Sequence, residues 1–145
     1  CAMYYPKYCT INVPKIKQIL SNDVIYNIVG TKLISCHTQQ AEIIIPDDIC
    51  YIGERAFSGC TNLKKVFISS NIISISDFAF DDSGIICVDV CEKNEYYSSV
   101  NGSLFNSKGT ELVKYFNRSY NTRVALPQQV EVIGNKSFVA SALIV

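Results

Sequence analysis

The sequence predicts a β-rich repeat solenoid, and three observations lead to this fold class. The chain of 145 residues contains 19 Ile and 13 Val against 7 Leu and 7 Ala, which favours strands because β-branched side chains fit a pleated sheet. A short motif recurs after 23 residues, and a longer segment is duplicated further along the chain. Hydrophobic residues make up 48% and charged residues 18% of the sequence, so the composition is that of a folded domain and excludes a disordered chain.

The short motif spans residues 45–57 and returns at residues 68–80 and 126–138. Its apolar positions in the first copy are Ile49, Ile52 and Phe57, each matched 23 residues later. A period this short indicates one coil of a solenoid per copy, because a unit of this size buries its apolar face only by stacking on its neighbours.

Side-chain alternation along the strands predicts which residues face the interior of the coils. Val66 and Ile68 share one face of a strand, and the period places Ile43 and Val88 beside Val66 in the neighbouring coils. We expect these aliphatic side chains to form a continuous ladder. The motif also contributes one large core residue per coil, namely Phe57, Phe80 and Phe138.

The longer duplication relates residues 30–35 (GTKLIS) to residues 109–114 (GTELVK). Each copy belongs to a pair of short runs around a glycine turn, 25–29 with 33–36 and 102–106 with 112–115. Two short runs around a glycine predict a β-hairpin, so we expect two hairpins inserted between coils, with Gly30 and Gly109 in their turns.

The domain organisation follows from these matches. Residues 1–23 match the repeat poorly and form a degenerate or capping segment, in which Ile16, Ile19 and Leu20 at helical spacing leave open a short helix or a degenerate coil. Residues 24–145 form the solenoid, with a hairpin at 24–41, coils at 42–91, a hairpin insertion at 92–122 and a coil at 123–145. We expect this last coil to be cut at its end, because residues 142–145 (ALIV) are apolar without a polar cap.

The repeat resembles the BspA-like leucine-rich repeats, also called the treponemal type. The matching text is Ile45-Pro46 with Ile49 and Ile52-Gly53, then residues 56–60 (AFSGC), Leu63 and Val66. Residues 96–105 (YYSSVNGSLF) are similar to the hairpin insertion of protozoan, trichomonad-like members. The resemblance implies a leucine-rich-repeat solenoid, often on bacterial or parasite surfaces and associated with adhesion to host proteins. The second copy departs from the pattern, with Ser69 for proline and Ser76 for glycine.

The sequence does not predict an enzyme, a cofactor or a metal site. The one histidine, His37, follows Cys36 directly, and adjacent residues of a strand point to opposite faces, so we expect a surface role for His37. Cys87 and Cys91 lack the second ligand pair that zinc requires. The carboxylate pairs 47–48 and 81–82 lie where turns are expected, and capping of backbone amides outweighs calcium binding as their interpretation.

The outward positions of the parallel strands form the candidate binding site for a protein partner. An exposed face of a solenoid is wide and contiguous, and an aliphatic side chain beside an aromatic one on such a face is typical of protein contacts. An equally weighted alternative is that the inserted hairpins or a neighbouring subunit cover the face. The candidate residues are Glu42, Ile44, Lys65, Phe67, Asp89 and Arg123, with Cys87 and Ala125 on the same face.

We therefore expect a non-enzymatic protein-binding module at a cell surface or in a secreted protein. The alternative is an intracellular, cytoplasmic scaffold component that assembles through the exposed ends of the solenoid. The 13 basic and 13 acidic residues give zero net charge, which argues against a nucleic-acid partner, and no apolar run suits membrane insertion. Seven cysteines, an odd number, leave at least one thiol unpaired within the chain. Glycosylation of a secreted form would use Asn101, Asn117 or Asn135.

Overall fold

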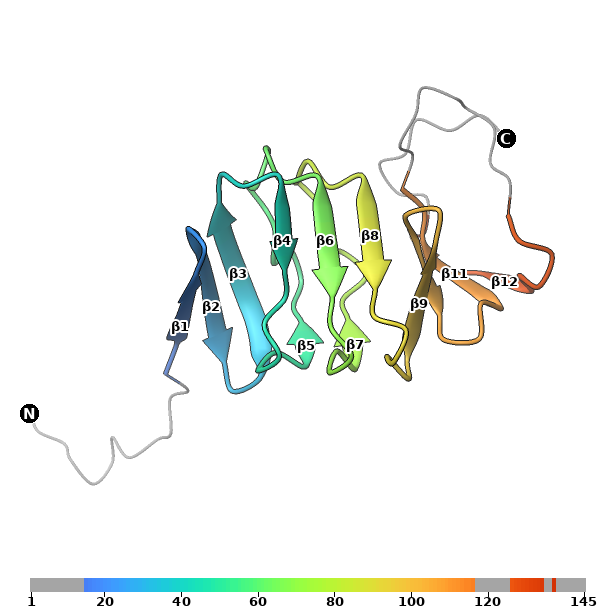
Figure 1. Cartoon of the computed structure of the whole chain (residues 1–145), viewed down its shortest axis with the longest axis horizontal. Coiled ribbons are helices and arrows are strands. Elements are labelled where there is room, and N and C mark those ends of the chain that lie inside the picture. The colour runs from blue at the N-terminus through green and yellow to red at the C-terminus, as the bar shows by residue number, and fades with distance from the viewer. Residues whose placement is uncertain (1–14, 117–125, 135–136, 138–145) are drawn as a thin grey trace, which may run out of the picture.

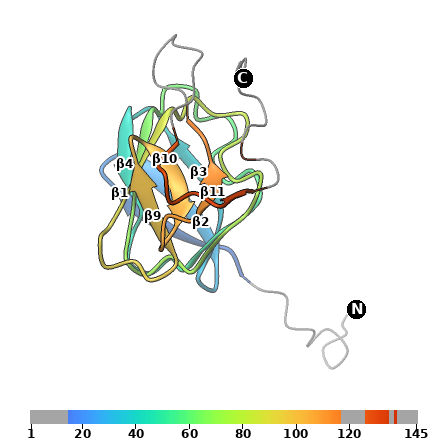
Figure 2. The same cartoon turned by 90° about the vertical axis from the view of Figure 1, so that its right-hand side faces the viewer.

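The chain folds into a stack of coils built from short strands around one apolar interior (Figure 1). This computed structural model describes residues 15–116, 126–134 and 137. Viewed along the stack in Figure 2, the backbones of successive coils overlie one another. The described residues contain no helix that is both long and apolar enough to cross a membrane.

One wall of the stack is a three-stranded parallel sheet of β4 (Glu42–Ile44), β6 (Lys65–Ile68) and β8 (Cys87–Val90). The register aligns Ile43 with Val66 and Val66 with Val88, at offsets of 23 and 22 residues. All three side chains are buried. The predicted ladder is therefore confirmed, with the second coil one residue shorter than the first.

The second wall belongs to a five-stranded sheet of order β1-β2-β3-β5-β7. The predicted hairpin is confirmed as β2 (Val24–Val29) and β3 (Lys32–Thr38), which pair antiparallel around Gly30 at φ 62°. Because β3 also pairs in parallel with β5 (Tyr51–Ile52), and β5 with β7 (Ser74–Ile75), the hairpin is continuous with the coils.

The segment before the hairpin is a strand, so the helix considered for residues 14–20 is wrong over its described part. Strand β1 (Lys17–Ser21) pairs antiparallel with β2 over five residue pairs. Asn22 and Asp23 connect them with positive φ angles of 48° and 64°, a turn geometry that asparagine and aspartate tolerate and that suits a tight hairpin. This Asn-Asp turn fixes the strand pairing, which the spacing of three apolar residues does not reveal.

The second insertion repeats the arrangement of the first. Strands β9 (Tyr97–Val100), β10 (Ser103–Asn106) and β11 (Glu111–Lys114) pair antiparallel, and β11 pairs in parallel with β12 (Val132–Ile133). Gly109 lies between β10 and β11 at φ 73°, as predicted. The pairing of β11 with β12 copies that of β3 with β5, so the longer duplication is structural.

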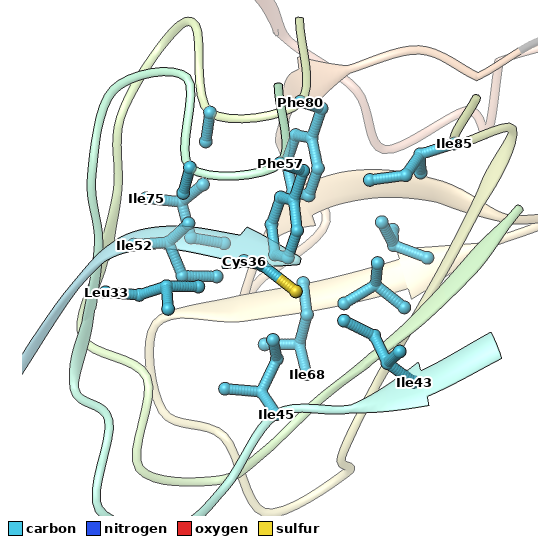
Figure 3. Close-up of a cluster of buried hydrophobic side chains, with 14 of the residues drawn as sticks. Leu33, Cys36, Ile43, Ile45, Ile52, Phe57, Ile68, Ile75, Phe80 and Ile85 are labelled. Carbon is cyan, nitrogen blue, oxygen red and sulfur yellow. The ribbon is translucent and has the colours of Figure 1, made fainter. Parts of the chain in front are cut away.

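The core lies between the two walls (Figure 3). The Phe57 and Phe80 rings stack at a centroid distance of 5.7 Å, and Phe116 packs edge-on against Phe80 at 5.3 Å. The prediction of one buried phenylalanine per coil is thus confirmed for the first two copies, and Phe138 lies outside the described residues. In the third copy Ile133 is 55% exposed, because no described strand lies on the far side of β12.

Candidate functional site

The parallel sheet presents two rows of residues on its outer face. Glu42 aligns with Lys65 and Cys87 in the first row. The second row contains Ile44, Phe67 and Asp89. Since the residues between these rows point into the core, strand alternation places both rows on the opposite side. Five of the six predicted site residues are described, and the structure brings those five together on one face.

The second row contains an exposed apolar group beside a partly covered one. Ile44 is 71% exposed, which is unusual for a large aliphatic side chain in a sheet. Phe67 is half-buried, and Lys65 Nζ lies 4.6 Å from the centroid of its ring. A cation over a ring face is an attractive contact that leaves the ring edge available. Lys65 and Phe67 therefore form one amphipathic unit beside Ile44.

Cys87 is not on the open face, which corrects the sequence-based expectation for this residue. It is only 6% exposed because the β9–β10 hairpin packs on this side of β8. Val88 N donates to Gly102 O at 2.9 Å, and Val90 N donates to Ser99 Oγ at 3.0 Å. These bonds hold the hairpin along the backbone edge of β8, while Asp89 on the same strand stays exposed, so the open face comprises the outward residues of β4 and β6 together with Asp89.

Two of the predicted outward residues, Arg123 and Ala125, lie outside the described residues. Their contribution to the face stays a prediction.

A hollow of about 460 Å³ opens where the three strands end. Its lining includes Ile44, Phe67 and Asp89 from the predicted site. Sequence reasoning missed Cys91 and Glu92, which also line it. Both residues directly follow β8, and this position could have indicated them. Residues that follow the last outward residue of a strand lie at the same end of the sheet as the hollow.

The hollow carries an excess of negative charge. Three carboxylates, Asp47, Asp89 and Glu92, line it together with apolar and serine side chains, and its lining contains no Lys or Arg. The chain as a whole has zero net charge, so this is a local excess. A hollow of this kind favours ligands that combine an apolar group with positive charge.

Nothing in the described part of the chain assembles a catalytic group. His37 is exposed, and its Nε2 lies 3.5 Å from Ser35 Oγ at the limit of a hydrogen bond. Among the described residues no three His, Cys, Asp or Glu side chains gather where they could hold a metal ion. Asp82 pairs with Arg55 and Asp81 with Lys114, so both carboxylates of that turn serve structural ion pairs.

The cysteines inside the coils are packing residues. Cys36 and Cys60 are buried, and the Cys60 thiol donates to Cys36 O at 3.1 Å. The hydrogen-bonding contact with the Cys60 thiol and burial both raise the pKa of Cys36, so this residue stays a neutral thiol. Cys60 is thus a small buried residue of the repeat, whereas Cys50 is half-buried.

Coils of short parallel strands around an apolar interior, with one sheet face open, define a leucine-rich-repeat solenoid. The sequence profile described as "BspA type Leucine rich repeat region (6 copies)" matches residues 27–144. The chain belongs to this family, and the resemblance seen in the sequence is confirmed at that level. The closer likeness to protozoan members stays a prediction. Families of this type consist of repeats rather than of a catalytic domain.

Two solved structures share the fold. The pneumococcal vaccine antigen PcpA is similar with a TM-score of 0.54 and 23% identity over 70% of this chain and 31% of PcpA. A leucine-rich repeat protein from Eubacterium ventriosum gives a TM-score of 0.55 and 22% identity over 63% of this chain and 25% of that protein. The present chain thus spans less than a third of either protein. No curated protein matches it.

Proposed function

We propose that this chain is a non-enzymatic protein-binding module whose site is the open face of the parallel sheet. The site comprises the outward residues of β4 and β6 together with Asp89 of β8. The observation that carries the proposal is the exposed Ile44 side chain, aligned with Phe67 at the edge of an acidic hollow. Burying apolar area contributes about 25 cal/mol per Å², so these two residues are the expected anchors, and the charged residues around them select the partner.

The proposal is tested with two substitutions on the face and one on the opposite wall. An Ile44→Ser plus Phe67→Ala variant removes both anchors, while Tyr51→Ser, on β5, changes an exposed side chain of the other sheet. The ligands are a panel of purified extracellular-matrix and serum proteins, measured by biolayer interferometry. For a panel protein that binds, we expect the double variant to lose about tenfold or more in affinity and Tyr51→Ser to lose little. Unchanged affinity in a double variant that keeps its circular dichroism spectrum would reject the face as the site.

Adhesion at a cell surface, or in a secreted protein, is the finer form of the proposal. It rests on the family resemblance. The two solved structures, at 23% and 22% identity, support a shared fold and not a shared function. Asn101 begins an Asn-Gly-Ser sequon and is exposed in the turn between β9 and β10. A glycan at this position would therefore meet no steric obstacle from the core.

A cytoplasmic scaffold component is the second candidate, and the cysteines favour it. All five described cysteines are free thiols, as is usual in a reducing compartment. Intact mass of the protein from its native source separates the two candidates, measured with and without glycosidase and after thiol alkylation in denaturant. A glycan on Asn101 would support the secreted form, and seven alkylated thiols without a glycan would support the cytoplasmic one.

A further inference from the structure

One edge of the parallel sheet is unpaired. Lys65 N donates to Ala41 O at 3.0 Å, and Ile45 N donates to Phe67 O at 3.0 Å, so alternate residues of β4 bond to β6. The backbone groups of the residues between them, Glu42 and Ile44, therefore point to the opposite side. No described strand pairs with that side of β4, which is the first strand of its sheet.

A groove of about 810 Å³ lies along this free edge. It runs between β4 and the turn that joins β1 to β2, and its lining includes Leu20, Tyr26 and Ile44. The Tyr26 hydroxyl donates to Ile44 O at 3.0 Å, which shows independently that the Ile44 backbone faces the groove. The N–H of Ile44 and both backbone groups of Glu42 remain directed into it, as a row that can pair with a further strand.

The side chains of the groove specify the chemistry of an occupant. Leu20 is 70% and Ile44 71% exposed, so the groove offers two large apolar surfaces. Its lining contains Asp23, Glu42 and Asp47 but no Lys or Arg. Because Glu42 and Ile44 lie on the same side of β4, a segment that pairs its backbone with β4 would place side chains two residues apart against these acidic and apolar groups.

We propose that the groove binds an extended, cationic segment of a partner protein as an additional strand on β4. The segment pairs its backbone with the free groups of Glu42 and Ile44, lays an aliphatic side chain against Leu20 and Ile44, and directs Lys or Arg side chains toward the carboxylates. This inference rests on the proposed function, because Ile44 and Phe67 line both the groove and the hollow on the face.

The probe is a synthetic seven-residue peptide with Lys at positions 1 and 5, Val at positions 3 and 7 and Thr between them, acetylated and amidated at its ends, so that Lys and Val share one face of the extended segment. Two matched peptides serve as controls, one with Glu in place of Lys and one with alternate backbone amides methylated. NMR titration with the whole chain is expected to show binding of the Lys peptide, with shift changes confined to β4, β6 and residues 19–26. We expect the Glu peptide and the methylated peptide to bind at least about tenfold more weakly, and the affinity of the Lys peptide to fall as salt is added.

Variants of the protein test the backbone pairing and the charge contacts separately. Ile44→Pro removes an N–H that makes no bond to β6, while Ile44→Ala removes the same side chain and keeps the N–H. We expect the proline variant to bind the Lys peptide at least about tenfold more weakly than the alanine variant. The triple variant Asp23→Asn, Glu42→Gln, Asp47→Asn is expected to lose about tenfold in affinity for the Lys peptide, and Glu54→Gln, an exposed carboxylate in the turn after β5, to lose nothing. Each variant is first compared with the wild type by its amide spectrum.

The outcomes separate this inference from the proposed function. Equal binding of the methylated peptide or of the proline variant would overturn strand addition, as would absence of binding by the Lys peptide. If strand addition fails in this way while a panel protein still binds and loses affinity when Phe67 is substituted, the face remains the site. Only the inference about the edge of β4 is then rejected. Dimerisation through β4 without peptide, measured by light scattering and abolished by Ile44→Pro, would identify a second copy of the chain as the occupant and overturn the cationic partner.

Discussion

Tyr26 connects the core to the free edge of the sheet. Its side chain is buried, with 1% of the residue exposed, and its hydroxyl donates to Ile44 O. Burial first, and then the electrostatic effect of Cys36, raises the pKa of Tyr26 above its ordinary value. The folded state therefore holds the neutral phenol in a pH range where the unfolded chain begins to lose its proton.

This shift predicts a loss of stability in alkali that depends on Tyr26. The raised pKa means that the folded chain binds more protons than the unfolded chain above the ordinary tyrosine pKa of about 10. Stability contributed by Tyr26 is fully present below that pH and declines above it, by about 1.4 kcal/mol per pH unit. Tyr26→Phe should lower the free energy of unfolding by about 1 kcal/mol at neutral pH through the lost hydrogen bond, and flatten its decline in alkali.

Urea unfolding between pH 8 and 11 measures both effects. Burial also raises the pKa of Tyr97. Because Tyr97 is present in both proteins, the difference between the wild type and the variant isolates the effect of Tyr26. Parallel stability curves for the two proteins would contradict the prediction.

Sequence reasoning at the residue scale located the apolar positions and missed the polar ones. Ile43, Val66 and Phe57 were predicted in the core because the 23-residue period repeats their side-chain type, and burial of such residues is what the period records. Asn94 is 6% exposed and lies 23 residues after Asn71, so the period does repeat this residue type. Its role depends on hydrogen bonds to backbone groups of another coil, and a matching asparagine alone does not reveal these bonds.

Asn94 holds the junction between the second coil and the inserted hairpin. Its Nδ2 donates to Ser69 O and Ile72 O, both at 2.9 Å. Its Oδ1 accepts from Tyr96 N and Tyr97 N, both at 2.8 Å. One amide side chain thus satisfies four backbone groups, and β9 begins three residues later at Tyr97.

At the scale of the element, Asn94→Ala is predicted to destabilise the chain strongly. The substitution leaves two carbonyls and two N–H groups without this partner, and each buried polar group left unsatisfied costs about 1–3 kcal/mol. Water reaching some of them reduces the sum, so we expect a loss of about 3 kcal/mol or more in the free energy of unfolding.

The matched control is Asn71→Ala. Asn71 is exposed, and its Nδ2 makes one hydrogen bond to a neighbouring coil, donating to Asp47 O at 3.0 Å. We expect Asn71→Ala to lower the free energy of unfolding by no more than about 1 kcal/mol. Equal destabilisation by the two substitutions in chemical denaturation would contradict the prediction that the four hydrogen bonds of Asn94 contribute more stability than the single bond of Asn71.

Sequence reasoning gave the wrong result for strand β1 and for the exposure of Cys87. Both depend on the elements packed beside them. The β1 strand exists because β2 offers it a paired edge through the Asn22-Asp23 turn, whereas its own apolar spacing suits a helix. Cys87 follows the outward alternation of β8, yet the β9–β10 hairpin covers it. Alternation predicts the side of a sheet on which a residue lies, and not what packs on that side.

At the scale of the whole molecule, each coil in the described ranges pairs only with the coils next to it. Strand β6 pairs with β4 on one side and β8 on the other, and β4 does not pair with β8. The same holds for β5, between β3 and β7. In such an array, stability is approximately the sum of the stability of each coil and of its interfaces. The period made this architecture predictable, while the free edge of β4 became visible only once every strand pairing was known.

Native-state hydrogen exchange should therefore vary along the stack. The β6 strand has a neighbour on both sides and buried Val66 and Ile68, so its amides should open only with much of the array and exchange slowest. The β1 strand has one partner and mostly exposed side chains, so its amides should exchange fastest among the described strands. At the end of β4, the N–H of Ile45 bonds to Phe67 O whereas that of Ile44 faces the groove, and Ile44 should exchange far faster than the residue beside it. Uniform protection along the strands, or slow exchange at Ile44 in the absence of any partner, would contradict both the additive stack and the open edge.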